Sequence, residues 1–321
     1  MNKSRYQILI TGNYRSGTEY FTNLLNCHPL VSSTMYRVNY FRFIYGRYNI
    51  TADKEIIIKD LADRLFKRYK IKINKKKFLT SLNNNSHGEF YDSIMSNLYL
   101  NKNKKIWAEK CQLLWREIPN FMNLMNNPKV IHIIRDPRAV ILSFKKETRY
   151  KSPAYLGSAF NSVDAMNSII KHKEMYKKRF TYLRYEDLVK DKDYEMKKIF
   201  KFLNIYPITK YNQNKKWIQN SSFQKKISRP FNYDYIQGNS LWKKKLVFDE
   251  INFVETICEK YMNYFRYKRT SKKNMKKNKI QKLIGKKYDL FKAYRNWDKS
   301  NHRVGFQRFP ANPLDGRTWT R

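Results

Sequence analysis

The hydrophobic pattern changes at a short polar turn near the start of the chain. Residues 8–10 form an unbroken apolar run, which is typical of a strand covered on both faces in a parallel sheet. Beyond the turn, apolar residues recur at helical spacing, at Phe21, Leu24 and Leu25. This order predicts a buried strand, a tight turn, and a helix that packs on the sheet.

Similar patterns continue along the chain. Apolar stripes at helical spacing predict a mostly helical insert over residues 51–100. Two more apolar runs predict buried strands at residues 105–109 and 130–134, and helical patterns follow both, the first over residues 113–125. A last helix is predicted over residues 248–265. With 321 residues, the chain has room for one large α/β domain and an appendage.

The composition changes after Tyr267. Residues 268–279 are a charge run that is typical of a solvated linker. Apolar residues then return among lysines and predict a basic amphipathic helix, at Ile280, Leu283, Ile284, Tyr288 and Phe291. Such a helix suits an anionic membrane surface, and it equally suits docking on its own domain. We therefore expect a domain over residues 1–268 and a basic C-terminal extension over residues 269–321.

The charge balance is extreme, with a formal net charge of +41 from 67 Lys+Arg and 26 Asp+Glu. This excess suits nucleic-acid binding. The abundance of Asn, Ile, Tyr and Lys also fits a bias toward A/T-rich codons, so the charge has two explanations. Three well-separated cysteines suit a reducing compartment and offer no metal-binding spacing. No apolar run reaches the ~20 residues of a membrane span, and the early first strand leaves no room for a signal peptide. We expect a cytoplasmic protein.

The turn after the first strand has the spacing of a phosphate-binding loop. Gly12 and Gly17 bracket four residues, and a strand that leads through such a turn into a helix directs backbone N–H groups at one point. In nucleotide triphosphatases a lysine follows the second glycine. Here Thr18 and Glu19 follow it, and the cation is Arg15, inside the loop. The loop therefore indicates phosphate binding without a bound metal, and an ordinary turn is the alternative.

A second candidate anion site follows the strand predicted at residues 130–134. Asp136 and Pro137 are helix-start signals, which place Arg135 at the strand tip. Ser143 lies about two helical turns after Asp136 and so returns to the same face. An arginine and a serine in this arrangement can clamp an anion. A helix cap with an ordinary ion pair is the alternative.

Three segments, YRSGTEYFTNLLNCHP, VIHIIRDPRAVILSF and YLRYEDL, together resemble the sulfotransferases that use 3'-phosphoadenosine 5'-phosphosulfate (PAPS). The resemblance covers about residues 6–268. It implies a P-loop-type three-layer α/β fold, with a central parallel sheet flanked by helices. It also implies that the loop holds the 5'-phosphosulfate, Arg135 and Ser143 hold the 3'-phosphate, and Tyr185 lies near the adenine. The donor-binding residues implied are Tyr14, Arg15, Ser16, Gly17, Thr18, Glu19, Arg135, Ser143, Tyr185, Ser222 and Arg229.

Sulfuryl transfer needs an in-line acceptor oxygen, stabilisation of the leaving phosphate, and a base. Arg15 and the loop amides suit the leaving phosphate. Glu109 and Lys110 belong to a W-A-E-K stretch similar to the W-x-E-K of carbohydrate sulfotransferases, in which the lysine meets the sulfuryl group or the acceptor. Lys110 is therefore a predicted catalytic residue. Glu109 is the predicted base, and the alternatives are Glu19, His87 and Glu89.

We therefore expect a PAPS-dependent sulfotransferase that acts without a metal on a hydroxyl, or as a second choice an amine. The expected acceptor is a saccharide or glycolipid, on family analogy and on the aromatic and basic character of the insert. Two alternatives remain. A P-loop nucleotide kinase is disfavoured by Thr18 where its lysine belongs. A basic nucleic-acid-binding protein is supported by charge alone, so no specific nucleic acid is expected as a partner.

Overall fold

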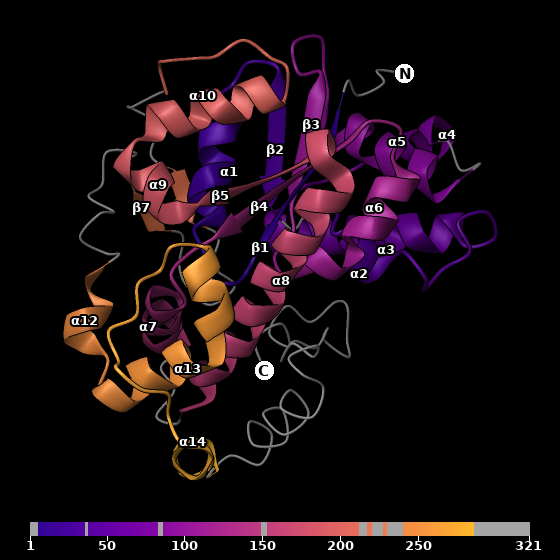
Figure 1. Ribbon diagram of the computed structural model, residues 1–321. Helices are drawn as coiled ribbons and strands as arrows, with labels where there is room; N and C mark the ends of the chain where they lie inside the picture. The colour runs from indigo at the N-terminus through magenta and orange to yellow at the C-terminus, as the bar shows by residue number, and fades with distance from the viewer. Residues whose placement is uncertain are drawn as a thin grey trace.

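A five-stranded parallel sheet, in the order β2-β3-β1-β4-β5, is the centre of the fold (Figure 1). The strands are β1 Gln7–Gly12, β2 Val31–Met35, β3 Ile106–Lys110, β4 Pro128–Ile134 and β5 Phe180–Arg184. A separate antiparallel pair joins β6 Trp217–Gln219 to β7 Ile227–Arg229. The computed structural model describes residues 6–35, 38–82, 86–148, 153–211, 217–219, 227–229 and 240–285.

Helices cover both faces of the sheet. Successive residues of β1 point to opposite faces, so that Ile8 and Ile10 join one core cluster and Leu9 joins the other. The first cluster includes α1 Thr18–Asn26, α9 Tyr185–Lys190 and α10 Lys192–Phe202. The second includes α2 Tyr40–Phe43, α3 Lys54–Tyr69, α4 Lys75–Ser81, α5 His87–Tyr99, α6 Ile118–Leu124, α7 Pro137–Thr148, α8 Ser158–Tyr176 and α13 Phe248–Tyr264. This confirms the predicted three-layer α/β fold.

The strand, turn and helix expected at the start of the chain are present. β1 is buried along its whole length. α1 begins directly after the turn, and its apolar stripe of Phe21, Leu24 and Leu25 is fully buried. The carboxyl end of β1, the turn and the first turn of α1 therefore lie together at one edge of the sheet.

Residues 51–100 are mostly helical, as expected. Figure 1 shows α3, α4 and α5 grouped on the same side of the molecule, beyond β3. The predicted helix over residues 113–125 is instead divided into a 3-10 helix, η1 Leu114–Glu117, and α6. Leu113 before η1 has a left-handed φ of 64°, and a proline lies in the first turn of α6.

The two edge strands, β2 and β5, were not predicted from the sequence. β2 has the sequence VSSTM, in which three hydroxyl residues conceal the strand. β5 reads FTYLR and is only partly buried. Edge strands pair on one side only, so they lack the unbroken apolar run that identified the central strands.

The prediction that residues 268–279 form a solvated linker is wrong in part. Ser271 and Met275 are buried against the domain. Beyond them, α14 Lys277–Ile284 buries Ile280 and Ile284, so the described part of the extension docks on its own domain. Tyr288 and Phe291 of the predicted helix lie outside the described residues. Among the residues that are described, no helix has the length and apolar character needed to cross a bilayer.

A buried histidine makes stability depend on pH. His132 of β4 is fully buried beside Trp115, and burial, with the nearby His172, lowers its pKa from 6.5 to about 3. The folded protein thus keeps His132 neutral, whereas the unfolded chain takes up a proton below about pH 6.5. The contribution of His132 is fully present above that pH and is lost as the pH falls toward 3.

The variant His132→Phe is therefore expected to lose less stability on acidification than the wild type. The difference between pH 7 and pH 5 should be about 2 kcal/mol smaller in the variant, because Phe fills the site and cannot be protonated. Urea unfolding at the two pH values measures it. An equal loss of stability in both proteins would contradict this assignment.

Candidate functional site

Hydrogen bonds within the loop between β1 and α1, and from this loop to α8, fix its conformation. Ser16 donates hydrogen bonds through its backbone N–H and its Oγ to the carbonyl of Asn13, at 3.3 and 2.7 Å. The side chain of Asn13 in turn donates to Ser162 Oγ in α8, at 2.9 Å. Asn13 and Ser16 are buried, whereas Arg15 between them is only partly buried. The loop is therefore a fixed turn in which the Arg15 side chain remains partly exposed.

Gly17 allows Tyr185 to approach the loop. Gly17 has φ 91°, and a Cβ built on it would lie 2.1 Å from the Tyr185 ring. No side chain fits there without a shift of that ring. Tyr185, at the start of α9, therefore packs directly on the backbone at the start of α1, as the predicted donor site requires.

The predicted anion-binding residues lie together. Arg15 Nε donates to Ser143 Oγ of α7 at 3.0 Å. Arg135, at the tip of β4, donates through Nη1 to the carbonyl of Arg15 at 3.2 Å. Its guanidinium lies 4.5 Å from the centroid of the Tyr185 ring. Two cations, a hydroxyl, an aromatic ring and a helix N-terminus thus meet at the carboxyl ends of β1, β4 and β5, which is a place suited to an anionic nucleotide.

Tyr14 and Glu19 flank this arrangement. Tyr14 packs on Phe144 of α7, with ring centroids 6.2 Å apart. Glu19 Oε1 lies 3.3 Å from Lys110 Nζ. Lys110 is fully buried, and burial lowers its pKa, although Glu19 opposes the shift. Lys110 therefore lies on the face of the sheet that carries α1, beside the loop.

Gln112 was not found by the sequence analysis. Its Nε2 donates to Thr18 Oγ1 at 3.0 Å, which places the amide over the first residue of α1. The available signal was its position, two residues after Lys110 and just beyond the carboxyl end of β3. Polar residues immediately beyond such an end lie where open α/β sheets bind ligands.

Glu109, the predicted base, lies on the other face of the sheet from Lys110, and its carboxylate is held by groups of the protein itself. Oε1 accepts hydrogen bonds from the backbone N–H groups of Val38 and Asn39, at 2.7 and 2.8 Å. Oε2 accepts one from the Tyr91 hydroxyl at 2.7 Å. Burial raises the pKa of Glu109, although these hydrogen bonds oppose the shift. Glu109 is thus wholly buried, and both of its carboxylate oxygens accept hydrogen bonds from within the protein.

The alternative bases occupy different surroundings. His87, the first residue of α5, is partly exposed, and its Nδ1 lies 2.7 Å from the Tyr40 hydroxyl. Burial lowers the pKa of His87, which favours the neutral imidazole that a base requires. Glu89 follows in the same helical turn, where its backbone N–H is capped by Ser86. Ser222 and the side chain of Arg229 lie outside the described residues.

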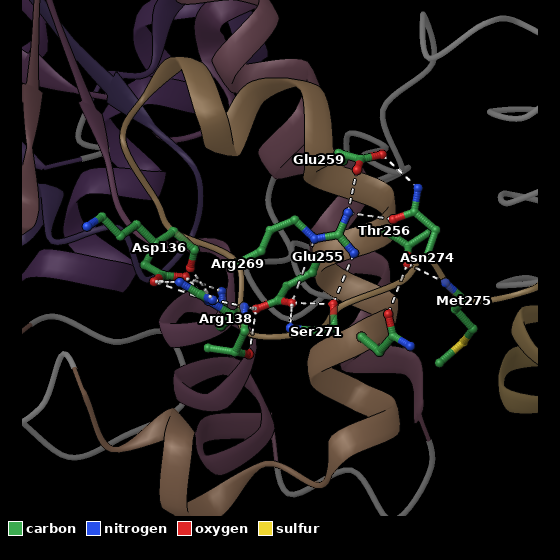
Figure 2. Close-up of polar contacts among 12 residues, drawn as sticks. Asp136, Arg138, Glu255, Thr256, Glu259, Arg269, Ser271, Asn274 and Met275 are labelled. Atoms are coloured by element: carbon green, nitrogen blue, oxygen red, sulfur yellow. Dashed lines mark hydrogen bonds and ion pairs between the residues drawn. The ribbon is translucent and has the colours of Figure 1, made fainter.

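A buried network of ion pairs and hydrogen bonds holds the start of α7, next to the predicted anion-binding residues (Figure 2). Arg138 Nη2 lies 2.7 Å from Asp136 Oδ2, and Nη1 pairs with Glu255 of α13. The guanidinium also lies 3.8 Å from the centroid of the Trp242 ring, in the short helix α12 Trp242–Lys245. Glu255 accepts further hydrogen bonds from the backbone N–H groups of Thr270 and Ser271. The start of α7, which follows Arg135, is thereby fixed to α13 and to the segment after it.

Comparisons with known proteins point to one kind of enzyme. The profile described as "Sulfotransferase family" matches residues 7–207. A sulfotransferase domain from the curacin biosynthetic pathway aligns with a TM-score of 0.55 and 16% identity, over 82% of this chain and 98% of that one. The sulfotransferase domain of the Synechococcus PCC 7002 olefin synthase gives 0.50 and 15%, over 80% and 96%. A mouse sulfotransferase complexed with PAP gives 0.45 and 14%, over 80% and 85%. No curated protein sequence matches the chain. At these identities the solved structures show a shared fold.

Proposed function

This chain belongs to the sulfotransferase family, and we propose that it transfers a sulfuryl group from PAPS to a hydroxyl of a saccharide or glycolipid. The observation that carries the proposal is the meeting of Arg15, Arg135, Ser143 and Tyr185 around the turn at Gly17. These residues come from four parts of the chain. The two guanidinium groups offer positive charge to two phosphate groups, and the tyrosine ring offers a face to the adenine. Together they match a nucleotide that is phosphorylated at two positions.

Each charged or aromatic part of the donor has residues that would hold it. The turn at Gly17 and the start of α1 offer backbone N–H groups and Arg15 to the 5'-phosphosulfate. Arg135 and Ser143 would hold the 3'-phosphate, and Tyr185 would face the adenine. The mouse sulfotransferase was solved with PAP, the product that remains when PAPS has lost its sulfuryl group. The position of Arg15 inside the loop, with Thr18 where a kinase lysine would stand, favours this donor over a nucleoside triphosphate.

The chain's own residues supply the charge stabilisation that the transfer needs. PAPS, when bound, supplies the sulfuryl group. The acceptor oxygen forms a bond to sulfur as the bond from sulfur to the phosphate oxygen breaks, and the acceptor proton passes to a base. Arg15 and the loop N–H groups stabilise the charge that develops on the leaving phosphate. We assign to Lys110, which pairs with Glu19 beside the loop, the role of neutralising the sulfuryl oxygens.

The proposed acceptor class draws its support from residues near the other half of the sheet edge. The donor residues follow β1, β4 and β5, which leaves the side of β2 and β3 for the acceptor. The chain that follows β2 carries the partly exposed Tyr45, whose ring centroid lies 5.0 Å from that of His87, and the exposed Arg47. Aromatic faces with polar and cationic neighbours suit a sugar.

A transfer assay tests the proposal. The purified chain is incubated in EDTA with radiolabelled PAPS and either an N-acetylglucosamine oligosaccharide or a glycosylceramide. We expect label on at least one of the two acceptors, and no label when unlabelled PAP is in large excess. PAP binding without transfer to either compound would contradict the acceptor class. Absence of PAP binding would contradict the donor.

A further inference from the structure

The turn after β2 is held from both sides by charged side chains. Glu109 accepts the backbone N–H groups of Val38 and Asn39. The carbonyl of Val38 accepts from Arg64 Nη2 at 2.9 Å. Asn39 has a left-handed φ of 47°, which costs energy for a residue other than glycine. Backbone in this conformation needs such partners to persist, and a buried carboxylate is the strongest acceptor for its N–H groups.

Contacts continue from Glu109 to the start of α5. Tyr91 donates to Glu109, and its ring stacks on Tyr40 with centroids 4.5 Å apart and an interplanar angle of 10°. The Tyr40 hydroxyl in turn bonds to His87. Tyr91 and His87 lie one turn apart in α5. A continuous series of contacts therefore leads from the end of β3 to the partly exposed imidazole.

Two adjacent residues of β3 point to opposite faces of the sheet and hold different parts of the proposed site. Lys110 faces α1 and pairs with Glu19 beside the donor loop, whereas Glu109 faces the opposite side and holds the turn that leads into α2. The turn at Val38 follows the carboxyl end of β2, in the half of the sheet edge that the donor residues leave free, and the start of α5 is joined to this turn through the Tyr40–His87 contact. The rigid strand thus sets the position of the acceptor side relative to the donor.

We propose that Glu109 is a positioning residue, which fixes the turn at Val38 and Asn39 and the Tyr91–Tyr40–His87 series as the acceptor-side wall of the site. This inference rests on the proposed function. Glu109 acts through these neighbours and takes no proton from the acceptor. The base is then another group, and His87, at the end of the series, is the one whose ring this wall orients.

Two substitutions separate positioning from proton transfer. In Glu109→Gln, the amide oxygen can still accept both backbone N–H groups, and the amide nitrogen can donate to the Tyr91 oxygen. The wall is preserved, although a base at this position would be lost. In Glu109→Ala, two buried N–H groups and one hydroxyl lose their partner, so the turn loosens.

The experiment combines hydrogen exchange with kinetics. Exchange measured by mass spectrometry reports on the backbone N–H groups of Val38 and Asn39. Kinetics use radiolabelled PAPS and the acceptor that the transfer assay identifies, and calorimetry measures PAP affinity. Glu174→Gln removes a glutamate charge at an exposed site of α8 and is the matched control.

For Glu109→Gln we expect exchange, kcat and the pH profile of kcat to stay within about threefold of the wild type. For Glu109→Ala we expect exchange at the turn to accelerate and the acceptor KM to rise, each by about tenfold or more, with PAP affinity within about twofold. A hundredfold fall of kcat in Glu109→Gln with normal exchange would overturn the proposal and make Glu109 the base. Unchanged exchange in Glu109→Ala would also overturn it.

The outcomes remain distinct in two difficult cases. If Glu109→Ala does not fold, Glu109→Gln alone decides between positioning and proton transfer, because it keeps the contacts. If the wild type neither binds PAP nor transfers label, the proposed function fails. The exchange data then still decide whether Glu109 holds the turn.

Discussion

Replacing Arg135 with alanine is expected to weaken PAP binding by about 10- to 100-fold, the effect of losing a charge-assisted hydrogen bond to a phosphate. Arg135 lies at the tip of β4, with Nη1 bonded to the Arg15 carbonyl and its guanidinium over Tyr185. A phosphate held there would lose its cationic partner, and the loop would lose one contact. Isothermal titration calorimetry measures the change.

The matched control is Arg116→Ala. Arg116 also forms an ion pair, with Asp164 at 2.6 Å, but its side chain is 46% exposed and lies in η1, outside the proposed donor site. Its variant should bind PAP as the wild type does. If Arg135→Ala keeps wild-type PAP affinity with an unchanged circular dichroism spectrum, the donor site has been placed wrongly.

Replacing Arg138 with leucine is expected to lower the free energy of unfolding by about 3–5 kcal/mol. Its side chain is 3% exposed, and the removal of its charge takes the cation from Asp136 and the nearer of two cations from Glu255, whose other partner, Arg269, lies 4.0 Å away. Burial opposes ionisation of Glu255, but hydrogen bonds from Ser271 and Thr270 outweigh it and lower the pKa of Glu255. Glu255 therefore stays charged in the variant, and the loss of the Arg138 partner destabilises the folded protein.

The comparison with Arg116→Leu isolates the effect of burial. That substitution also breaks an arginine–carboxylate pair, yet at an exposed site it should cost only about 0–1 kcal/mol. Urea unfolding at neutral pH measures both variants. Equal losses in the two would show that the network drawn in Figure 2 contributes no more than a surface ion pair.

The features that could be predicted from the sequence are local ones. The loop at Gly12 and Gly17 is defined by one strand, one turn and one helix that are contiguous in the chain. Arg135 and Ser143 are likewise related by the geometry of a single helix, α7. What these segments share is that neighbours in sequence determine both their shape and their chemistry.

The features that escaped prediction depend on distant partners. The contacts of Glu109 with Val38 and of Arg138 with Glu255 span 71 and 117 residues. No periodicity reports such pairs, so the sequence gives no sign that both carboxylate oxygens of Glu109 accept hydrogen bonds within the protein. Ser271 was assigned to a solvated linker for the same reason, because the carboxylate that holds it belongs to α13.

The most direct test of the central claim is calorimetric titration of the wild-type chain with PAP in EDTA, with ATP and magnesium titrated separately. The proposed donor site predicts metal-free binding of PAP at least about tenfold tighter than that of ATP, because Arg135 and Ser143 meet a 3'-phosphate that ATP lacks. Preference for ATP with magnesium, or no binding of PAP, would contradict the assignment of this site to PAPS.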